Sequence, residues 1–183
     1  MNAAIYTIGH SNRSIEDLIA LLQRHHVQRL MDIRAFPRSR RFPHFDRNPL
    51  SVSLAHDSIG YEWIGKDLGG YRKPRSDSPH TALRDASFRG FADYMTDERF
   101  LGAIEKLLAE ANSRTTALMC AEANHHHCHR QFIADHLVLA DYNIFHIGSD
   151  GSVEPHRLHG CLNSSQLPPI YNKHEQGDLF ADV

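Results

Sequence analysis

The residues best able to do chemistry lie in one ten-residue stretch, CAEANHHHCH, which runs from Cys120 to His129. Thiolates and imidazoles are the ligands that zinc and related transition metals prefer in proteins. Cys120, Cys128 and His129 are therefore a candidate site for a transition metal such as zinc or iron, with His10 or Glu122 as a further ligand. The spacing is irregular for a zinc site, because the cysteines are eight residues apart and no C-x-x-C pair is present.

The same stretch also fits a reactive thiol. Cys128 lies at the start of a predicted helix, where the helix dipole lowers the pKa of a thiol, and Arg130 adds positive charge. Cys120, beside Glu122, is a second candidate nucleophile. A third interpretation is that both cysteines are small core residues. The histidines at 125–127 are interpreted as a solvated loop.

A second candidate site is the stretch RAFPRSRRFPHFDR, residues 34–47. Guanidinium groups bind phosphate through paired hydrogen bonds, and aromatic rings stack on bases. Four arginines are predicted to bind a phosphate-bearing substrate, with Ser11 beside them: Arg34, Arg38, Arg40 and Arg41. The alternative is a solvated loop. The net charge of -2 and the pI near 6.7 mean that binding of nucleic acid would depend on such a local patch.

The elements that must position these residues alternate between strands and helices. Short apolar runs predict strands at residues 4–8, 27–33, 61–64, 115–119 and 143–147. Helical periodicity follows Ser14, a predicted N-cap, and recurs over 88–95, 98–111 and 129–140. We predict one α/β domain over residues 1–162, with a mostly parallel sheet of about five strands flanked by helices. Residues 163–183 are predicted to form an extended polar tail.

The candidate chemical groups follow the predicted strands. Ligands of parallel α/β sheets bind at the carboxyl ends of the strands. The residues expected to converge there are His10 and Ser11, Asp32 and Arg34, and Cys120 and Glu122. The predicted catalytic set is Cys120, Glu122, Cys128, His129, Arg130, His10 and Asp32. The sequence LGG at 68–70 lacks the rest of a P-loop or dinucleotide motif, so we predict no nucleotide cofactor.

Five motifs, in order, resemble a known family: YTIGHSN, DIRAFPRSRR, DLGG, FRGFADYM, and MCAE followed by CHR. Together they resemble the domain of unknown function 488, from about Ile5 to Ile147. The resemblance implies a compact α/β domain found mainly in bacteria and archaea, and it supplies no reaction. The family's motif residues match His10, Asp32, Arg34, Pro37, Cys120, Glu122, Cys128, His129 and Arg130. Residues 125–127 depart from the motif.

The C-terminal residues contain a Q-x-x-L-F pattern formed by Gln176, Leu179 and Phe180. This pattern resembles the peptide by which bacterial replication and repair proteins bind the DNA polymerase sliding clamp. Two adjacent apolar side chains on a flexible tail would enter a pocket, and Gln176 would anchor them. The alternative is that Leu179 and Phe180 pack back on the domain.

The composition of the chain indicates the cellular compartment in which we expect the protein. No apolar run reaches the roughly 18 residues of a membrane span, and the N-terminal residues lack the pattern of a signal peptide. The three cysteines do not form a disulfide framework, so we expect a cytoplasmic protein with free thiols and no membrane partner.

The preferred function is an enzyme that acts on or binds DNA, RNA or another phosphate-bearing substrate, in DNA repair or processing linked to the clamp. The alternatives are a metal- or thiol-based sensor without turnover, and a cysteine enzyme on a phosphorylated metabolite.

Overall fold

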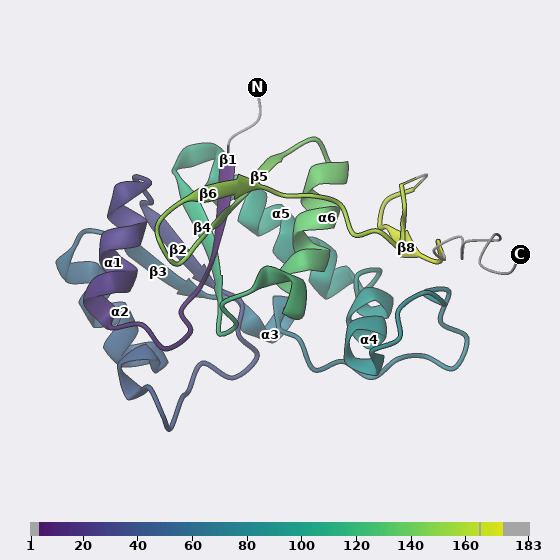
Figure 1. Ribbon diagram of the computed structural model, residues 1–183, viewed down its shortest axis with the longest axis horizontal. Coiled ribbons are helices and arrows are strands. Elements are labelled where there is room, and N and C mark those ends of the chain that lie inside the picture. The colour runs from purple at the N-terminus through teal and green to yellow at the C-terminus, as the bar shows by residue number, and fades with distance from the viewer. Residues whose placement is uncertain (1–3, 165, 174–183) are drawn as a thin grey trace, which may run out of the picture.

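The computed structural model describes residues 4–164 and 166–173, and its centre is a six-stranded sheet (Figure 1). The strand order is β3-β2-β4-β1-β5-β6. These strands are β1 (Ala4–Gly9), β2 (Arg29–Asp32), β3 (Gly60–Trp63), β4 (Thr116–Cys120), β5 (Asn143–Ile147) and β6 (Val153–Pro155). The first five are parallel, and β6 runs antiparallel to β5. The predicted α/β class with a mostly parallel sheet is confirmed, and β6 is an addition that sequence periodicity did not reveal.

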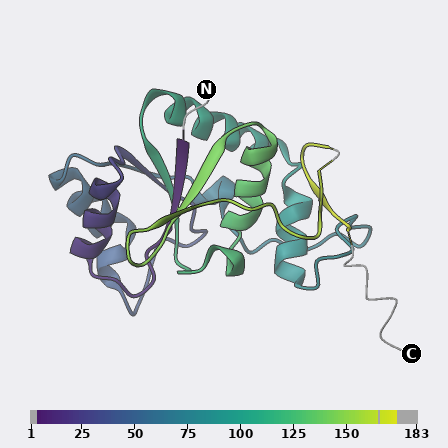
Figure 2. The ribbon, with the colours of Figure 1, turned by 45° about the horizontal axis from the view of Figure 1, so that its top comes forward.

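Helices cover both faces of the sheet. Helices α1 (Ile15–Arg24) and α2 (Arg47–His56) lie on one side, and α5 (Glu98–Ser113) and α6 (Arg130–Leu139) lie on the other (Figures 1 and 2). The shorter helical elements are η1 (Pro43–Phe45), α3 (Gly65–Leu68), α4 (Ala86–Tyr94) and η2 (His125–His127). The sheet therefore separates two apolar cores, one beneath α1 and α2 and a larger one beneath α4, α5 and α6.

Local sequence signals explain where the helices begin. Ser14 accepts a hydrogen bond from the backbone N–H of Asp17 at 3.1 Å and caps α1, as predicted. Asp97 caps α5 in the same way through the N–H of Arg99. Acidic residues in the first turns of both helices also favour the positive end of the helix dipole.

The register of the central strands brings their carboxyl ends level. Gly9, the last residue of β1, pairs with Cys120, the last residue of β4. A Cβ atom at Gly9 would lie 1.8 Å from the carbonyl oxygen of Glu122, so only glycine permits this approach. The close packing places His10 beside the loop that carries Glu122, which is the convergence that the sheet topology predicts.

Part of the predicted tail is packed on the domain. Strands β7 (Leu162–Asn163) and β8 (Ile170–Tyr171) form a small antiparallel sheet. Tyr171 is fully buried, and its hydroxyl donates a 2.9 Å hydrogen bond to Asp135 of α6. Residues 163–173 are mostly polar, so the sequence did not indicate that Tyr171 anchors this segment to the domain. The Q-x-x-L-F residues lie outside the residues that the structure describes.

Among the described residues, none of the helices combines the length and the apolar character needed to cross a membrane.

Candidate active site

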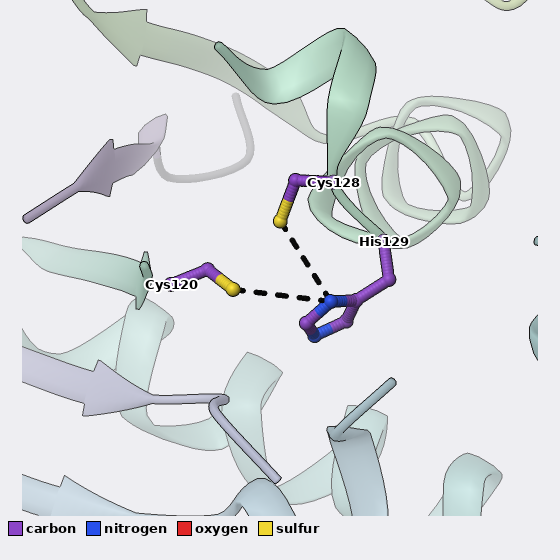
Figure 3. A group of neighbouring side chains, drawn as sticks. All are labelled: Cys120, Cys128 and His129. Atoms are coloured by element: carbon purple, nitrogen blue, oxygen red, sulfur yellow. Dashed lines mark hydrogen bonds between the residues drawn. The ribbon is translucent and has the colours of Figure 1, made fainter. Parts of the chain in front are cut away.

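Three potential metal ligands meet at the carboxyl edge of the sheet. Cys120 ends β4, whereas Cys128 and His129 lie just before α6 (Figure 3). The Nδ1 atom of His129 is 3.9 Å from the sulfur of Cys120 and 3.7 Å from that of Cys128. All three ligand atoms lie within 4.8 Å of one another, and both sulfurs point toward the imidazole ring. The predicted grouping of these residues is therefore confirmed.

The orientation of His129 suits a metal ligand. Its Nε2–H donates to the carbonyl oxygen of Ile33 at 3.2 Å, which leaves the lone pair of Nδ1 directed at the two sulfurs. A backbone carbonyl commonly holds the outer nitrogen of a metal-binding histidine in this way. In a tetrahedral zinc site, the usual bond lengths place sulfur and nitrogen roughly 3.5 Å apart. The observed separations are close to that value.

Gly70 leaves space in front of these ligands. A Cβ atom at this position would lie 3.3 Å from Nδ1 of His129, which is tighter than an ordinary contact. The glycine of the DLGG motif thus keeps a side chain away from the nitrogen that would bind the ion. The donor set and this open approach both fit a three-ligand site with one free position, the arrangement typical of catalytic zinc.

The two thiols differ in their electrostatic environment. Burial opposes ionisation of Cys128, but a hydrogen bond from Cys120 and the positive charge of the nearby Arg130 lower the pKa of Cys128 well below its usual value. The hydrogen bond with Cys128, together with burial, raises the pKa of Cys120. Cys128 is therefore the thiol of this pair that loses its proton first.

Arg130 supplies a positive charge next to this pair. Its side chain is 1% exposed, and among the described residues its guanidinium bonds only to neutral oxygens. These are the carbonyl groups of Glu122, at 2.5 Å, and Ala123, and the hydroxyl of Thr7. Because a buried cation is costly without a counter-charge, the thiolate of the cysteine pair stabilises Arg130 as much as Arg130 stabilises the thiolate.

The ligands open into a cavity of about 380 Å³. Its polar wall includes His10, Arg34, Arg38 and Glu122. Four residues with phenyl or phenol rings also line the cavity: Phe36, Tyr71, Phe88 and Phe91. A cavity of this size and mixed lining is typical of a small-ligand site.

A buried ion pair between Asp32 and Arg34 lies at the edge of the cavity, and Arg34 is its member on the cavity wall. Asp32 accepts hydrogen bonds from Arg34 at 2.9 Å (Nε) and 2.6 Å (Nη2), and Tyr61 donates to the same carboxylate at 2.7 Å. Arg34 also donates to Nε2 of His10 at 3.2 Å, while Nδ1–H of His10 donates to the carbonyl of Ser11. Burial and the charge of Arg34 lower the pKa of His10 to about 4. His10 is thus neutral with both nitrogens occupied, and it positions Arg34.

A hydrogen-bond chain links the site to the C-terminal strands. It runs through six side chains: Arg130, Thr7, His146, His156, Asp135 and Tyr171. With Asp135 as a carboxylate, His156 donates through Nε2 and accepts through Nδ1 from His146, at 2.8 Å for each bond. Thr7 then donates to Nδ1 of His146 at 2.7 Å. Each hydrogen bond in this series therefore has a defined donor and a defined acceptor.

The interpretation of residues 125–127 as a solvated loop was wrong for one of them. His125 is buried, and its ring stacks on that of His146 with centroids 3.5 Å apart. The nitrogens of His125, His146 and His156 also lie within 4.8 Å of one another. However, nearly parallel rings cannot direct their lone pairs at one ion, and both nitrogens of His146 are already bonded. We assign this second cluster to packing.

The other predicted site residues are distributed unevenly. Arg38 lies on the cavity wall, whereas Arg40 and Arg41 are exposed farther along the same loop. Asp32, Arg130 and Ser11 support the wall from behind and are not part of it. Sequence reasoning did not identify Gly70, Tyr71, Phe88 and Phe91 as site residues. The DLGG and FRGFADYM motifs contain Gly70, Phe88 and Phe91, whereas Tyr71 lies outside the motifs.

The chain matches the model of a known protein family. A family model described as Domain of unknown function DUF488 matches residues 14–137, which is more than half of the 183 residues. Neither the curated proteins nor the solved structures contain a significant match. The three candidate ligands all lie in the matched segment.

Proposed function

Because the chain belongs to the DUF488 family, whose description names no reaction, we propose its function from the site itself. The proposal is a metal-dependent hydrolase that acts on a phosphate-bearing substrate, with nucleic acid as the preferred class. The observation that carries it is the convergence of Cys120, Cys128 and His129 on one point at the wall of an open cavity. Zinc bound there would supply Lewis-acid chemistry.

The residues of the chain have separate roles in this proposal. Glu122 is exposed on the cavity wall two residues after Cys120, where its carboxylate can take the proton from an attacking water. Arg38 is the exposed cation on the same wall and suits a phosphate oxygen. Arg34 is held by Asp32 and His10, so it contributes a fixed positive charge. Phe88 and Phe91 provide an apolar wall.

A thiol-based sensor is the second candidate, and the short distance between the Cys120 and Cys128 sulfurs, within 4.8 Å, supports it. Two adjacent thiols can be oxidised to a disulfide with loss of two electrons and two protons to an oxidant such as hydrogen peroxide. Such a protein would bind no metal in its reduced state, and it would catalyse no hydrolysis.

Metal analysis of the purified protein tests the proposal. We expect about one zinc or iron per chain, and loss of that metal in Cys128→Ser and in His129→Ala. Cys161→Ser is the matched control, because Cys161 is half-buried and outside the ligand group. Glu122→Gln should retain the metal but lose hydrolysis of oligonucleotide or phosphate-ester substrates. A reduced protein that binds no transition metal, even after supplementation, would reject the hydrolase and favour the sensor.

The Q-x-x-L-F pattern supports DNA processing beside the sliding clamp as the setting for this activity. The pattern lies outside the described residues, so this part of the proposal depends on sequence alone.

A further inference from the structure

Two aromatic side chains at the rim of the cavity are exposed to solvent. Phe36 is 72% exposed and Tyr71 is 82% exposed, yet both contribute to the cavity wall. Their ring centroids are 5.8 Å apart and the rings are tilted by 50°, so each presents a free face. Exposed apolar groups that gather beside a cavity typically mark a binding site.

The backbone at Tyr71 is held in an unfavourable conformation. Its φ of 65° lies in the left-handed region, which is unusual for a bulky residue. The residues on both sides are fixed: Gly70 lies against His129, and the guanidinium of Arg72 stacks 3.9 Å from the ring centroid of Tyr94. The surrounding structure therefore maintains a strained residue that buries little, which is a pattern found at functional sites.

The loop that carries Phe36 is also fixed in place. Asp46 accepts a 2.6 Å hydrogen bond from the backbone of Ser39, and Ser39 accepts one from the backbone of Phe42. The N–H of Arg47 bonds to the carbonyl of Pro37 and closes the loop. A loop that is ordered before binding loses less entropy when a ligand arrives.

Positive charge lies next to the exposed rings. Arg38 shares the cavity wall with Phe36, and Arg40 and Arg41 are exposed farther along the loop. Phosphates could therefore contact the loop while a planar ring enters the cavity. Aromatic faces beside a row of cations are the combination by which proteins bind single-stranded nucleic acid.

We propose that Phe36 and Tyr71 form a stacking rim that admits one unpaired nucleobase of a single-stranded nucleic acid into the cavity, with the flanking phosphates against Arg38, Arg40 and Arg41. This inference rests on the proposed function, because it names the substrate class of the same site. Paired bases are excluded by this arrangement, since a base inside a duplex cannot present its face to a side chain.

Binding of a fluorescent single-stranded 12-mer tests the rim. Tyr71→Ala and Phe36→Ala should each weaken binding by roughly tenfold, which is about 1.4 kcal/mol and within the range for loss of one base stack. Tyr71→Phe and Phe36→Tyr retain an aromatic face and should bind like the original chain. A duplex of the same sequence should bind more weakly than the single strand.

An abasic 12-mer separates stacking from phosphate binding. It should bind weakly, and it should not distinguish Tyr71→Ala from the original chain. Changing Arg38, Arg40 and Arg41 to Ala should reduce the slope of log affinity against log salt by up to about 0.7 for each phosphate that an arginine no longer neutralises. Equal binding of the abasic and normal strands would overturn the proposal.

The test of the aromatic rim can be separated from the test of the metal site. Tyr71→Ala should keep its full metal content, because Tyr71 is not a ligand. The metal-free Cys128→Ser variant should still bind the single strand and discriminate it from the abasic strand, provided that its thermal unfolding shows an intact fold. If oligonucleotide affinity is insensitive to both rim residues, the rim serves another partner, such as a protein, and the inference is wrong whatever the metal content.

Discussion

The Asp32–Arg34 pair offers the sharpest test of how the site is held together. Replacing Asp32 with Asn keeps the shape of the side chain but leaves the Arg34 guanidinium buried without a counter-charge. The carboxylate of Asp32 is 0% exposed and accepts four hydrogen bonds, three from Arg34 and one from Tyr61. Arg34 itself is 5% exposed, so little of its surface is available to water that would take the place of the carboxylate.

The size of the effect follows from this geometry. Removing one partner of a buried ion pair typically costs about 3–5 kcal/mol of unfolding free energy. For a domain of this size, each kcal/mol corresponds to roughly 2–4 °C in melting temperature, so Asp32→Asn should melt roughly 6–20 °C lower. Glu110→Gln is the control, because the side chains of its two pairs, with Arg29 and Arg114, are 20–42% exposed and their loss should cost below about 1 kcal/mol for each pair.

Thermal and urea unfolding of these variants measure the expected differences in unfolding free energy. The double variant Asp32→Leu with Arg34→Met removes both charges and should be more stable than Asp32→Asn, since no unpaired charge remains. Equal losses for Asp32→Asn and Glu110→Gln would refute the reasoning. A double variant as unstable as the sum of its single variants would also refute it.

Three further predictions follow from other parts of the molecule. Burial lowers the pKa of His136 from 6.5 to about 4, so this side chain takes up a proton at a higher pH in the unfolded chain than in the folded one. His136 alone should therefore lower the unfolding free energy by about 1.4 kcal/mol per pH unit as the pH drops from 6.5 to 4, in addition to the falls from His10 and His125, whose pKa values burial also lowers to about 4. Urea titrations of His136→Leu should show a fall that is shallower by that amount. Gly70→Ala should melt within a few degrees of the original chain yet bind zinc roughly tenfold more weakly in a chelator competition, because its methyl group crowds the ligand nitrogen. A peptide of residues 174–183 should bind a bacterial sliding clamp with modest affinity, and calorimetry should show no binding after Leu179→Ala with Phe180→Ala.

The sequence predicted the sheet better than it predicted the site. Strands at 4–8 and 115–119 were recognisable because they are buried apolar runs, and their parallel pairing follows from the helices between them. Strand β6 was not predicted, because all three of its residues are exposed and one is a proline. Strand β8 was not predicted either, because it is short, lies in a polar segment and has Tyr171 as its only fully buried residue.

Side-chain roles depended on contacts that the sequence does not contain. Cys120, Cys128 and His129 could be grouped because they lie in one ten-residue stretch and have the side chains that transition metals prefer. Asp32 could not be distinguished from a catalytic acid until its four hydrogen bonds were known. Tyr71 gave no signal, because a left-handed backbone conformation outside glycine is set by its neighbours and not by a motif.

The hydrogen-bond chain behind the site extends beyond the segment that the DUF488 family model matches. The matched residues 14–137 include Arg130 and Asp135 but not Thr7, His146 or Tyr171. They also leave out β1 and β5, two of the middle strands of the sheet. A chain trimmed to the matched segment would therefore keep both buried charges of α6 and lose the neutral groups that connect them. In this chain, a domain boundary that keeps this connection intact lies outside the matched segment on both sides.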